Sequence, residues 1–457
     1  MTNKHAGAGE VNTREIILDM LIDICEKGAY SHVVLRQTLR KYQYLDKRDR
    51  AFITRIVEGT LENKIYIDYV INQVSNIKVQ KMKPLIRNLL RMSVYQVLMM
   101  DSVPAAAACN EAVKLAIKRS FGQLKGFVNG VIRAVIRNID TMKFPNASLD
   151  LVEHMHIMYS MPKWIIEQLV YHYGVEDASR IIKGVSKHDE RICVRMNTAK
   201  ATAEEIIAKL EAEDIKTERS EVYRDALYIS DIDFLENSDT FNEGLISVQD
   251  LSSMLVSVVA DPKEGNLCID MCAAPGGKAI HLYELMKGKG KVIARDISDY
   301  KVGLIEENID RTESYGVEAE VFDATELDKE MVGKADIVVA DLPCSGLGIM
   351  GKKSDIKYNM TPEKEKELVA LQRAMLDNAW QYVKPGGTLV YSTCTLNRDE
   401  NLDNMKYIEE KYPLERVDIS QYVPEGFCRG TAKDGYLQML PGIDGADGFF
   451  ICKFRRV

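Results

Sequence analysis

The chain has 457 residues, too many for one ordinary domain core, so we expect two or three domains. Its 46% hydrophobic and 28% charged residues are typical of a water-soluble globular protein, and no apolar run is long enough to cross a bilayer. The net charge of −8 conceals a basic segment, residues 31–140, with 19 Lys and Arg against 8 Asp and Glu, which favours a nucleic-acid partner over merely solvated helix faces.

The first part of the chain has the periodicity of amphipathic helices. VNTREIILDMLIDICEKG predicts a helix with Asn12 or Thr13 as N-cap and Gly28 as its end. Further helical stretches lie within 41–74, 84–100, 105–120 and 127–139. We therefore predict an all-α domain over residues 1–142. The basic residues that we expect to be exposed and to contact phosphates are Arg36, Arg40, Lys41, Lys47, Arg48 and Arg50. The start of the chain lacks the layout of a signal peptide, so we expect a cytoplasmic protein.

A second domain is predicted over residues 143–243. KFPNASLD, with Pro and Asn in a polar stretch, marks its boundary, and Pro162 opens a helix after it. RICVRMN and DALYIS have the pattern of strands, and AEEIIAKLEAE that of a helix between them. This order indicates a small α+β module.

From residue 244 to 457, strands alternate with helices. Strand-like runs that end in polar residues are LCIDMCAAPGGK, KVIARDIS, AEVFDAT, ADIVVADLPC and GGTLVYSTC, with amphipathic helical stretches between them. The alternation predicts a doubly wound parallel sheet of the Rossmann-like α/β class, whose carboxyl-terminal strand ends line the ligand crevice.

Acidic residues end the first strands of this sheet. Asp270 is followed by MCAAPGGK, whose small residues let a ligand approach the backbone, although the loop is neither G-x-G-x-x-G nor a Walker loop. Asp296 is placed to accept hydrogen bonds from ribose hydroxyls, and Asp323 to meet an adenine amine. Any one acid could simply cap a helix, but three in register predict an adenosyl cofactor without phosphates.

Two cysteines follow strands at the same crevice. Cys344 lies in DLPCSGLG and Cys394 in YSTCT, and the residues alone leave both equally eligible as a nucleophile. The nine cysteines, an odd number, argue for a reducing compartment, and the seven histidines form no metal-ligand set, so we expect no metal.

CAAPGGK, DLPCSGLG and YSTCT, in this order, resemble the Sun/Nop2 family of RNA cytosine-C5 methyltransferases, which use S-adenosylmethionine. The resemblance covers about residues 190–457, and ISVQDLSSML also fits it. NEAVKLAIKRSFGQLKGFVNGVIRAVIRN is similar to NusB, an RNA-binding all-α fold. The combination resembles the Sun (Fmu) type of this family, which implies methylation of 16S ribosomal RNA, at cytosine 967, through a covalent cysteine–cytosine adduct.

The resemblance also implies roles for individual residues. Cys394 would be the nucleophile, Cys344 would assist release of the adduct, and Asp341 would position the cytosine at the cofactor's edge. Lys278 would belong to both the catalytic and the cofactor site. The cofactor would be bound by Cys272, Ala273, Ala274, Pro275, Gly276, Gly277, Lys278, Asp296, Asp323 and Asp341. The thiol that attacks should have a lowered pKa, which a nearby cation would provide.

Other functions stay open at this point. The same catalytic motifs would serve a transfer RNA cytosine-C5 methyltransferase, and a non-catalytic RNA-binding ribosome-assembly factor could retain the fold. An amino-methyltransferase would need N/D-P-P-Y/F where this chain has DLPC. We expect a monomer that binds RNA and no membrane. After DLPCSGLG the chain departs from the family, since Ser354 replaces the usual proline before Asp355 and Ile356.

Overall fold

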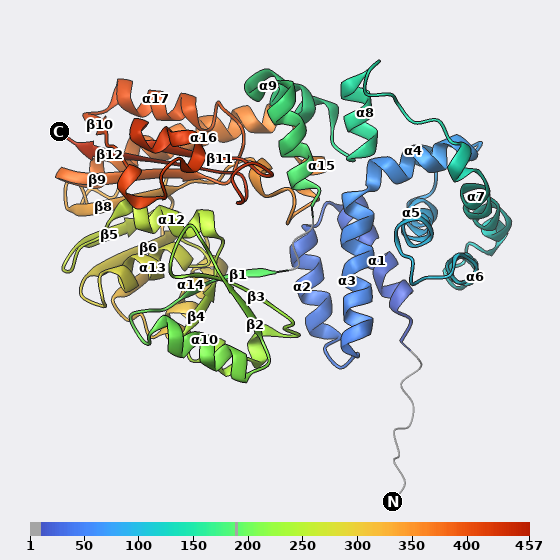
Figure 1. Ribbon diagram of the computed structural model, residues 1–457, viewed down its shortest axis with the longest axis horizontal. Coiled ribbons are helices and arrows are strands. Elements are labelled where there is room, and N and C mark those ends of the chain that lie inside the picture. The colour runs from blue at the N-terminus through green and yellow to red at the C-terminus, as the bar shows by residue number, and fades with distance from the viewer. Residues whose placement is uncertain (1–10, 188–190) are drawn as a thin grey trace, which may run out of the picture. The chain divides into compact units, whose positions relative to one another are not determined.

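The computed structural model describes residues 11–187 and 191–457 (Figure 1). The contacts divide it into two compact units. The first, here the helical unit, runs to Tyr171 and also includes Lys352–Asn359; the second, here the catalytic unit, holds His172–Gly351 and Met360–Val457. The expectations for residues 1–10, at the start of the first predicted domain and of the chain, lie outside the described residues.

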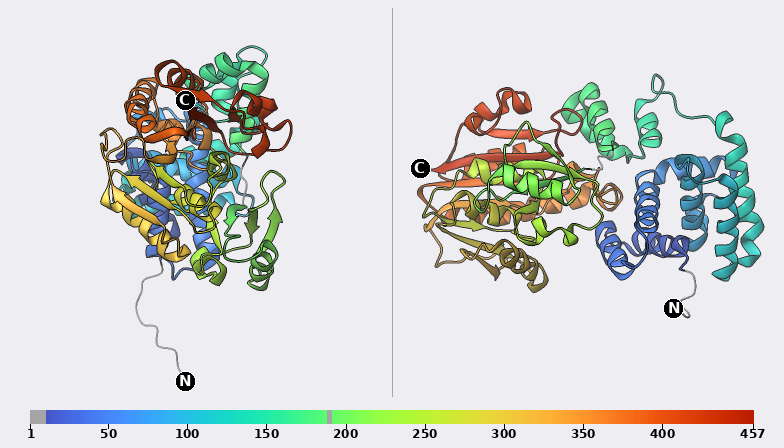
Figure 2. Two further views of the ribbon diagram at one scale, coloured as in Figure 1. Left: turned by 90° about the vertical axis from the view of Figure 1, so that its left-hand side faces the viewer. Right: turned by 60° about the horizontal axis from the view of Figure 1, so that its bottom comes forward.

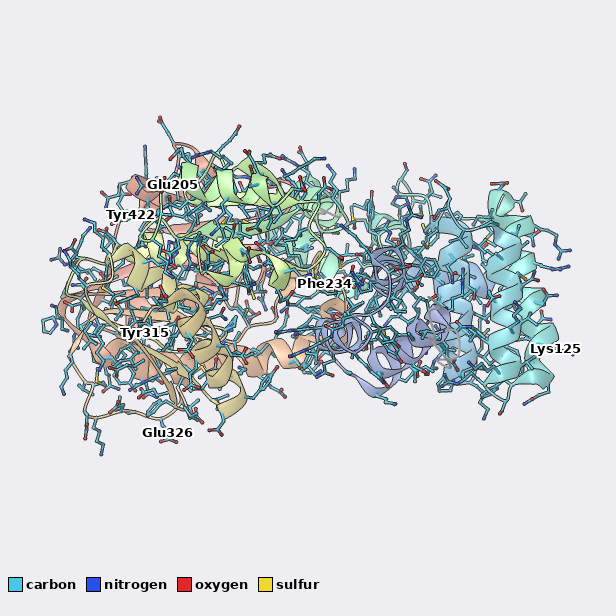
Figure 3. All side chains as sticks on the ribbon, turned by 90° about the horizontal axis from the view of Figure 1, so that it is seen from below. Lys125, Glu205, Phe234, Tyr315, Glu326 and Tyr422 are labelled. Atoms are coloured by element: carbon cyan, nitrogen blue, oxygen red, sulfur yellow. The ribbon has the colours of Figure 1, made fainter. Side chains whose placement is uncertain are left out.

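The helical unit is the all-α bundle that the periodicity predicts. Its first helix begins after Asn12, whose side chain accepts a hydrogen bond from the Glu15 N–H, and ends at Gly28 with φ 74°. Apolar residues from all its long helices form one core, and the exposed Lys125 begins one of the outer ones (Figure 3). Its helices are α1 (Thr13–Lys27), α2 (Ser31–Lys41), α3 (Lys47–Glu62), α4 (Lys64–Val74), α5 (Pro84–Met99), α6 (Ala105–Lys118), α7 (Lys125–Asn138), α8 (Leu151–Met158) and the short α15 (Ile356–Asn359).

Helix α9 (Lys163–Val185), which follows Pro162, leads into a small antiparallel sheet in the order β2-β3-β1-β4. The predicted strands and helix are β1 (Ile192–Met196), β3 (Ala226–Ser230) and α10 (Ala203–Ala212). The sequence did not reveal β2 (Lys216–Arg219), an exposed polar edge strand, or the three-residue β4 (Ile246–Val248), because neither is long or apolar enough to show a period. Strand β4 pairs with β1 although it lies beyond residue 243. A short helix, α11 (Asp239–Asn242), precedes it.

The large sheet has the order β10-β12-β9-β8-β5-β6-β7, with β11 paired to β12. Strands β5 to β9 pair in parallel, as predicted, whereas β12 is antiparallel to β9, a feature of this edge that the sequence analysis did not predict. An antiparallel edge on a parallel sheet is common in α/β folds. The strands are β5 (Leu267–Asp270), β6 (Lys291–Asp296), β7 (Val317–Val321), β8 (Ala335–Asp341), β9 (Val383–Thr393), β10 (Leu414–Arg416), β11 (Tyr436–Met439) and β12 (Phe449–Arg456).

Helices cover both faces of this sheet (Figure 2). Alternate strand residues belong to different clusters: Val339 packs with the helices of one face and Val338 with those of the other. Helices α12 (Leu251–Ala260), α13 (Gly277–Leu285) and α14 (Asp299–Thr312) cover the first face. The second face is covered by α16 (Pro362–Tyr382) and α17 (Leu402–Lys411). In the described part of the chain, no helix is both long and apolar enough to span a membrane.

Candidate active site

The carboxyl-terminal ends of the central parallel strands bring the predicted site residues together. Strands β5, β6 and β8 end at Asp270, Asp296 and Asp341, and Cys394 directly follows β9. Parallel pairing of β5 with β6 and β8, and of β8 with β9, places these ends along one edge of the sheet. Asp323 follows the end of β7 by two residues. The predicted strand-end residues therefore lie along one edge of the sheet, where the sequence places the ligand crevice.

The loop after β5 turns sharply into helix α13. The N–H of Gly276 donates to the Ala273 carbonyl at 2.7 Å, and Gly276 has φ +102°, a conformation that favours glycine. A Cβ at Gly276 would also press against Ile305. The N–H of Ala274 donates to Asp296 Oδ2 at 3.2 Å, so the second strand-end acid helps to hold this loop.

Asp296 and Asp323, the acids at the end of β6 and just after β7, have hydrogen-bond partners close to them in the sequence. Asp296 is 4% exposed, accepts a hydrogen bond from the Ile297 N–H at 2.8 Å and pairs with Lys301 at 3.0 Å. Asp323 accepts hydrogen bonds from the hydroxyl and N–H of Thr325, which hold the pKa of this carboxyl below its usual range. Asp323 therefore stays a charged acceptor at neutral pH, which suits recognition of an amine group.

A buried charge cluster lies between the first and fourth strand ends. Lys278 Nζ is 2.7 Å from Asp341 Oδ2, and Ser392 donates to Asp341 Oδ1 at 2.8 Å. Burial opposes charge on Lys278, but its interactions with Asp341 and Asp270 outweigh burial and raise the pKa of the ammonium. Burial raises the pKa of Asp270 to about 7 against the opposing effect of Lys278. The site thus holds a fixed cation beside a carboxyl that titrates near neutrality.

The two thiols face each other. Cys344 Sγ and Cys394 Sγ are 3.3 Å apart. The hydrogen bond with Cys394, followed by burial, raises the pKa of Cys344 well above the ordinary thiol value. Cys344 therefore stays a thiol at neutral pH and can donate its S–H to Cys394, although either sulfur can be the donor at this distance. Lys278 interacts electrostatically with Cys394, so a cation lies near this thiol.

A hydrogen-bond network joins the two cysteine loops. The Ser345 N–H donates to Glu400 Oε2 at 2.9 Å, and the Ser345 and Thr395 hydroxyls are 2.6 Å apart. The N–H of Gly348 donates to the Cys394 carbonyl at 3.0 Å. Sequence reasoning missed this network; Ser345 and Thr395 stand beside the motif cysteines, but nothing local distinguishes Glu400.

Residues 272–278, which the sequence predicts to bind the cofactor, are here called the cofactor loop, and the small sheet reaches this loop at Gly277. Arg195 of β1 is 1% exposed and makes a double ion pair with Glu284 of α13, at 2.8 and 2.9 Å. Its guanidinium also donates to the Gly277 carbonyl at 3.0 Å and to Gln249. No sequence pattern singled out Arg195, whereas Gln249 stands in the ISVQDLSSML segment.

Five of the six basic residues expected on the helical unit are exposed: Arg36, Arg40, Lys41, Lys47 and Arg48. The expectation is wrong for Arg50, which is 8% exposed and donates to the carbonyls of Leu45 and Gln43. A guanidinium can satisfy several carbonyls of a turn, and here it closes the α2–α3 connection. Tyr30 and Tyr44, 61% and 67% exposed, lie on the same stretch of chain as the five exposed residues.

The crevice fits an adenosyl sulfonium cofactor. The Cys272 N–H lies near Asp270, but neither oxygen of this fully buried carboxyl accepts a hydrogen bond of ordinary geometry within the described chain. Buried acceptors without partners are rare in proteins and indicate a place for a ligand's donors. Among the described residues, no group of three or more His, Cys, Asp or Glu side chains could hold a metal ion.

Comparisons with known proteins agree over nearly the whole chain. Family models match for the 16S rRNA methyltransferase RsmB/F over residues 257–455, the NusB family over 11–137 and the RsmF/B-like ferredoxin-like domain over 161–232. The "Probable ribosomal RNA small subunit methyltransferase B" of Bacillus subtilis (strain 168) is 36% identical over 450 residues, which are 98% of this chain and 99% of that protein.

Two solved structures are also similar. The crystal structure of PH0851 has a TM-score of 0.82 and 28% identity, and the match covers 98% of this chain and 99% of that one. The structure of NSun6 from Pyrococcus horikoshii with SFG has a TM-score of 0.59 and 25% identity over 65% of this chain and 98% of that one. The fold expected from the sequence, a NusB-like helical domain, a small α+β module and a methyltransferase sheet, is confirmed.

Proposed function

This chain belongs to the RsmB/F family of S-adenosylmethionine-dependent 16S ribosomal RNA cytosine methyltransferases, and we propose that it works through a covalent adduct between Cys394 and cytosine 967. One observation supports the adduct above all. Two sulfur atoms face each other at 3.3 Å in the crevice of acids, and the environment of Cys344 keeps that residue protonated. The resemblance to the family assigns the attack to Cys394 and adduct release to Cys344, and a thiol that stays protonated suits the second role.

Cytosine carbon 5 is a weak nucleophile, so the reaction starts at carbon 6. The Cys394 thiolate adds there, a sulfur–carbon bond forms, and the electron pair of the ring double bond becomes available at carbon 5. Bound S-adenosylmethionine would supply the electrophilic methyl group for that carbon. Afterwards the carbon-5 proton leaves to a base, and its electron pair restores the double bond and expels Cys394 as thiolate. Cys344, 3.3 Å away, donates its S–H to the departing sulfur and so assists release.

Asp341 and Lys278 prepare the base for this addition. The Asp341 carboxylate, fixed by Ser392 and Lys278, would hold the cytosine's amidine edge and favour a proton on the ring. Lys278, the last residue of the cofactor loop, keeps its positive charge beside the reacting thiol. Buried cations are most effective where solvent is excluded, and the Lys278 side chain is only 15% exposed.

The helical unit would hold the RNA while the target base leaves its stack. The exposed cations of α2 and the start of α3 are suited to phosphates, and Tyr30 and Tyr44 offer exposed rings on which unpaired bases can stack. These contacts would offset the cost of unstacking, a few kcal/mol.

The organisation that we propose has three domains, 1–142, 143–243 and 244–457, in one monomeric chain without a metal. The separate family matches support this division. The cytoplasm is the compartment we propose, because the target is ribosomal RNA and all nine cysteines are unpaired.

Bisulfite sequencing of 16S and transfer RNA from a deletion strain tests the target, and complementation tests the thiols. We expect cytosine 967 to lose its mark and wild-type enzyme to restore it. Cys394→Ala should abolish both methylation and covalent RNA adducts, while Cys344→Ala should accumulate adducts in the presence of cofactor. Loss of a mark only in transfer RNA would contradict the target, and the reverse pattern of adducts would contradict the assignment of the thiols.

A further inference from the structure

A short segment of chain after the Cys344 loop belongs to the helical unit. Cys344 and helix α16 lie in the catalytic unit, but the residues between them, Lys352–Asn359, are part of the helical unit. We call this segment the strap. It contains the departure from the family pattern, Ser354 before Asp355, which the catalytic mechanism does not use.

Asp355 of the strap caps a helix of the helical unit. Helix α2 has Tyr30 at its N-cap position, no side-chain cap and no acidic residue in its first turn. Asp355, 2% exposed, supplies what is missing, because Ser31 donates to it through its N–H at 3.2 Å and its hydroxyl at 2.5 Å. A carboxylate at a helix N-terminus satisfies unpaired N–H groups and interacts favourably with the helix dipole.

Lys357 and Tyr358 donate hydrogen bonds at the C-terminal end of helix α3. Helix α3 has no basic residue in its last turn, and the buried Lys357 donates to the Glu62 carbonyl at 3.0 Å. The Tyr358 hydroxyl donates to the Leu61 carbonyl at 2.8 Å, and Lys64 Nζ lies 3.6 Å from the centre of its ring. Burial lowers the pKa of Lys357 to about 7, so this side chain acts mainly as a hydrogen-bond donor. The strap thus brings a carboxyl acceptor to one helix N-terminus and two donors to one helix C-terminus, where backbone groups lack partners within the helix.

The other end of this stretch is fixed in the catalytic unit. The Gly348 N–H binds the Cys394 carbonyl, and its own carbonyl accepts from the Gly448 N–H at 2.9 Å. A Cβ at Gly351 would contact the Val185 carbonyl, so the chain leaves this unit along a tight path. Few residues therefore separate the thiol that assists release from the anchor at Asp355.

We infer that the strap makes the helical unit a positioning element for the Cys344 loop, with Asp355, Lys357 and Tyr358 as positioning residues. The helices that hold the strap, α2 and α3, are those with the exposed cations Arg36, Arg40, Lys41, Lys47 and Arg48. RNA bound on α2 and α3 restricts the motion of the helix ends that are hydrogen-bonded to the strap. The strap in turn restricts the position of Cys344. This inference rests on the proposed role of Cys344 in adduct release.

The test uses the full chain with unmodified 16S rRNA transcript and S-adenosylmethionine. Variants Asp355→Asn and Tyr358→Phe each remove hydrogen bonds of the strap with little change of size. The matched control is Glu26→Gln, which removes an ion pair to Arg87 in the same unit without touching the strap. Methylation rate, RNA affinity, cofactor affinity, thermal stability and covalent adduct on denaturing gels are measured for all, beside Cys344→Ala.

We expect the two strap variants to lower kcat about 10- to 100-fold, since small misplacements of a reacting group cost this much. RNA and cofactor affinities should stay within about twofold, and adduct should accumulate as in Cys344→Ala. Glu26→Gln should lose thermal stability without accumulating adduct. Unchanged kcat in both strap variants, or equal adduct in the control, would overturn the inference. If Cys344→Ala itself formed no adduct, the proposed release step would fail instead.

Discussion

Replacing Asp270 by Asn should stabilise the protein at and above neutral pH. The carboxyl is fully buried, and burial raises its pKa from 3.8 to about 7. The folded protein therefore retains a proton that the unfolded chain has already lost, so stability is full below pH 3.8 and is lost as pH rises through about 7. At ~1.4 kcal/mol per pH unit, the difference between the two pKa values changes the free energy of unfolding by about 4 kcal/mol.

Thermal melts between pH 5 and pH 8 test this reasoning. The wild-type protein should lose stability relative to Asp270→Asn as the pH rises, most of it below pH 7. Asp323→Asn is the matched control, because the Thr325 hydrogen bonds lower the pKa of that carboxyl below 3.8. Its contribution to stability is therefore constant between pH 5 and pH 8 and is lost only at lower pH, so this variant should keep the wild-type pH dependence. If Asp270→Asn kept the wild-type pH dependence, or were less stable at pH 8, burial would not be what governs this group.

Two other substitutions test how the site is held. Arg195→Met should lower the free energy of unfolding by about 3–5 kcal/mol, because it leaves the buried Glu284 without its ion-pair partner. Urea unfolding measures this change. A loss below about 0.5 kcal/mol would contradict a stabilising role of the ion pair. Gly348→Ala should lower the free energy of unfolding by more than about 2 kcal/mol and remove most of the activity, because the new Cβ would collide with the Gly448 carbonyl. Gly303→Ala is the control: it has open space in helix α14 and should be neutral or slightly stabilising. Equal melting temperatures of the two variants would refute this.

The local signals in the sequence located most of the fold and the centre of the site. Apolar periodicity marks the helices of the bundle and the long strands, and Asn12 and Gly28 bound the first helix as predicted. Polar residues directly after buried strands identified Asp270, Asp296 and Cys394, because carboxyl ends of parallel strands meet at one edge. Short or exposed strands such as β2 and β4 carry too little pattern to be recognised.

By itself, the sequence determined the class of fold, the chemistry of the crevice and the two candidate thiols, because these depend on residue type and spacing along the chain. Only the tertiary structure brought the two thiols to 3.3 Å from each other, and the hydrogen bond with Cys394, together with burial, raises the pKa of Cys344. It also showed that Arg50, expected to contact RNA, instead donates hydrogen bonds to carbonyls of the α2–α3 turn. The same packing places Arg195 against the cofactor loop and Asp355 at the N-terminus of helix α2. Each of these depends on partners brought together by folding, and a side chain's charge, burial and hydrogen bonds are properties of that packing.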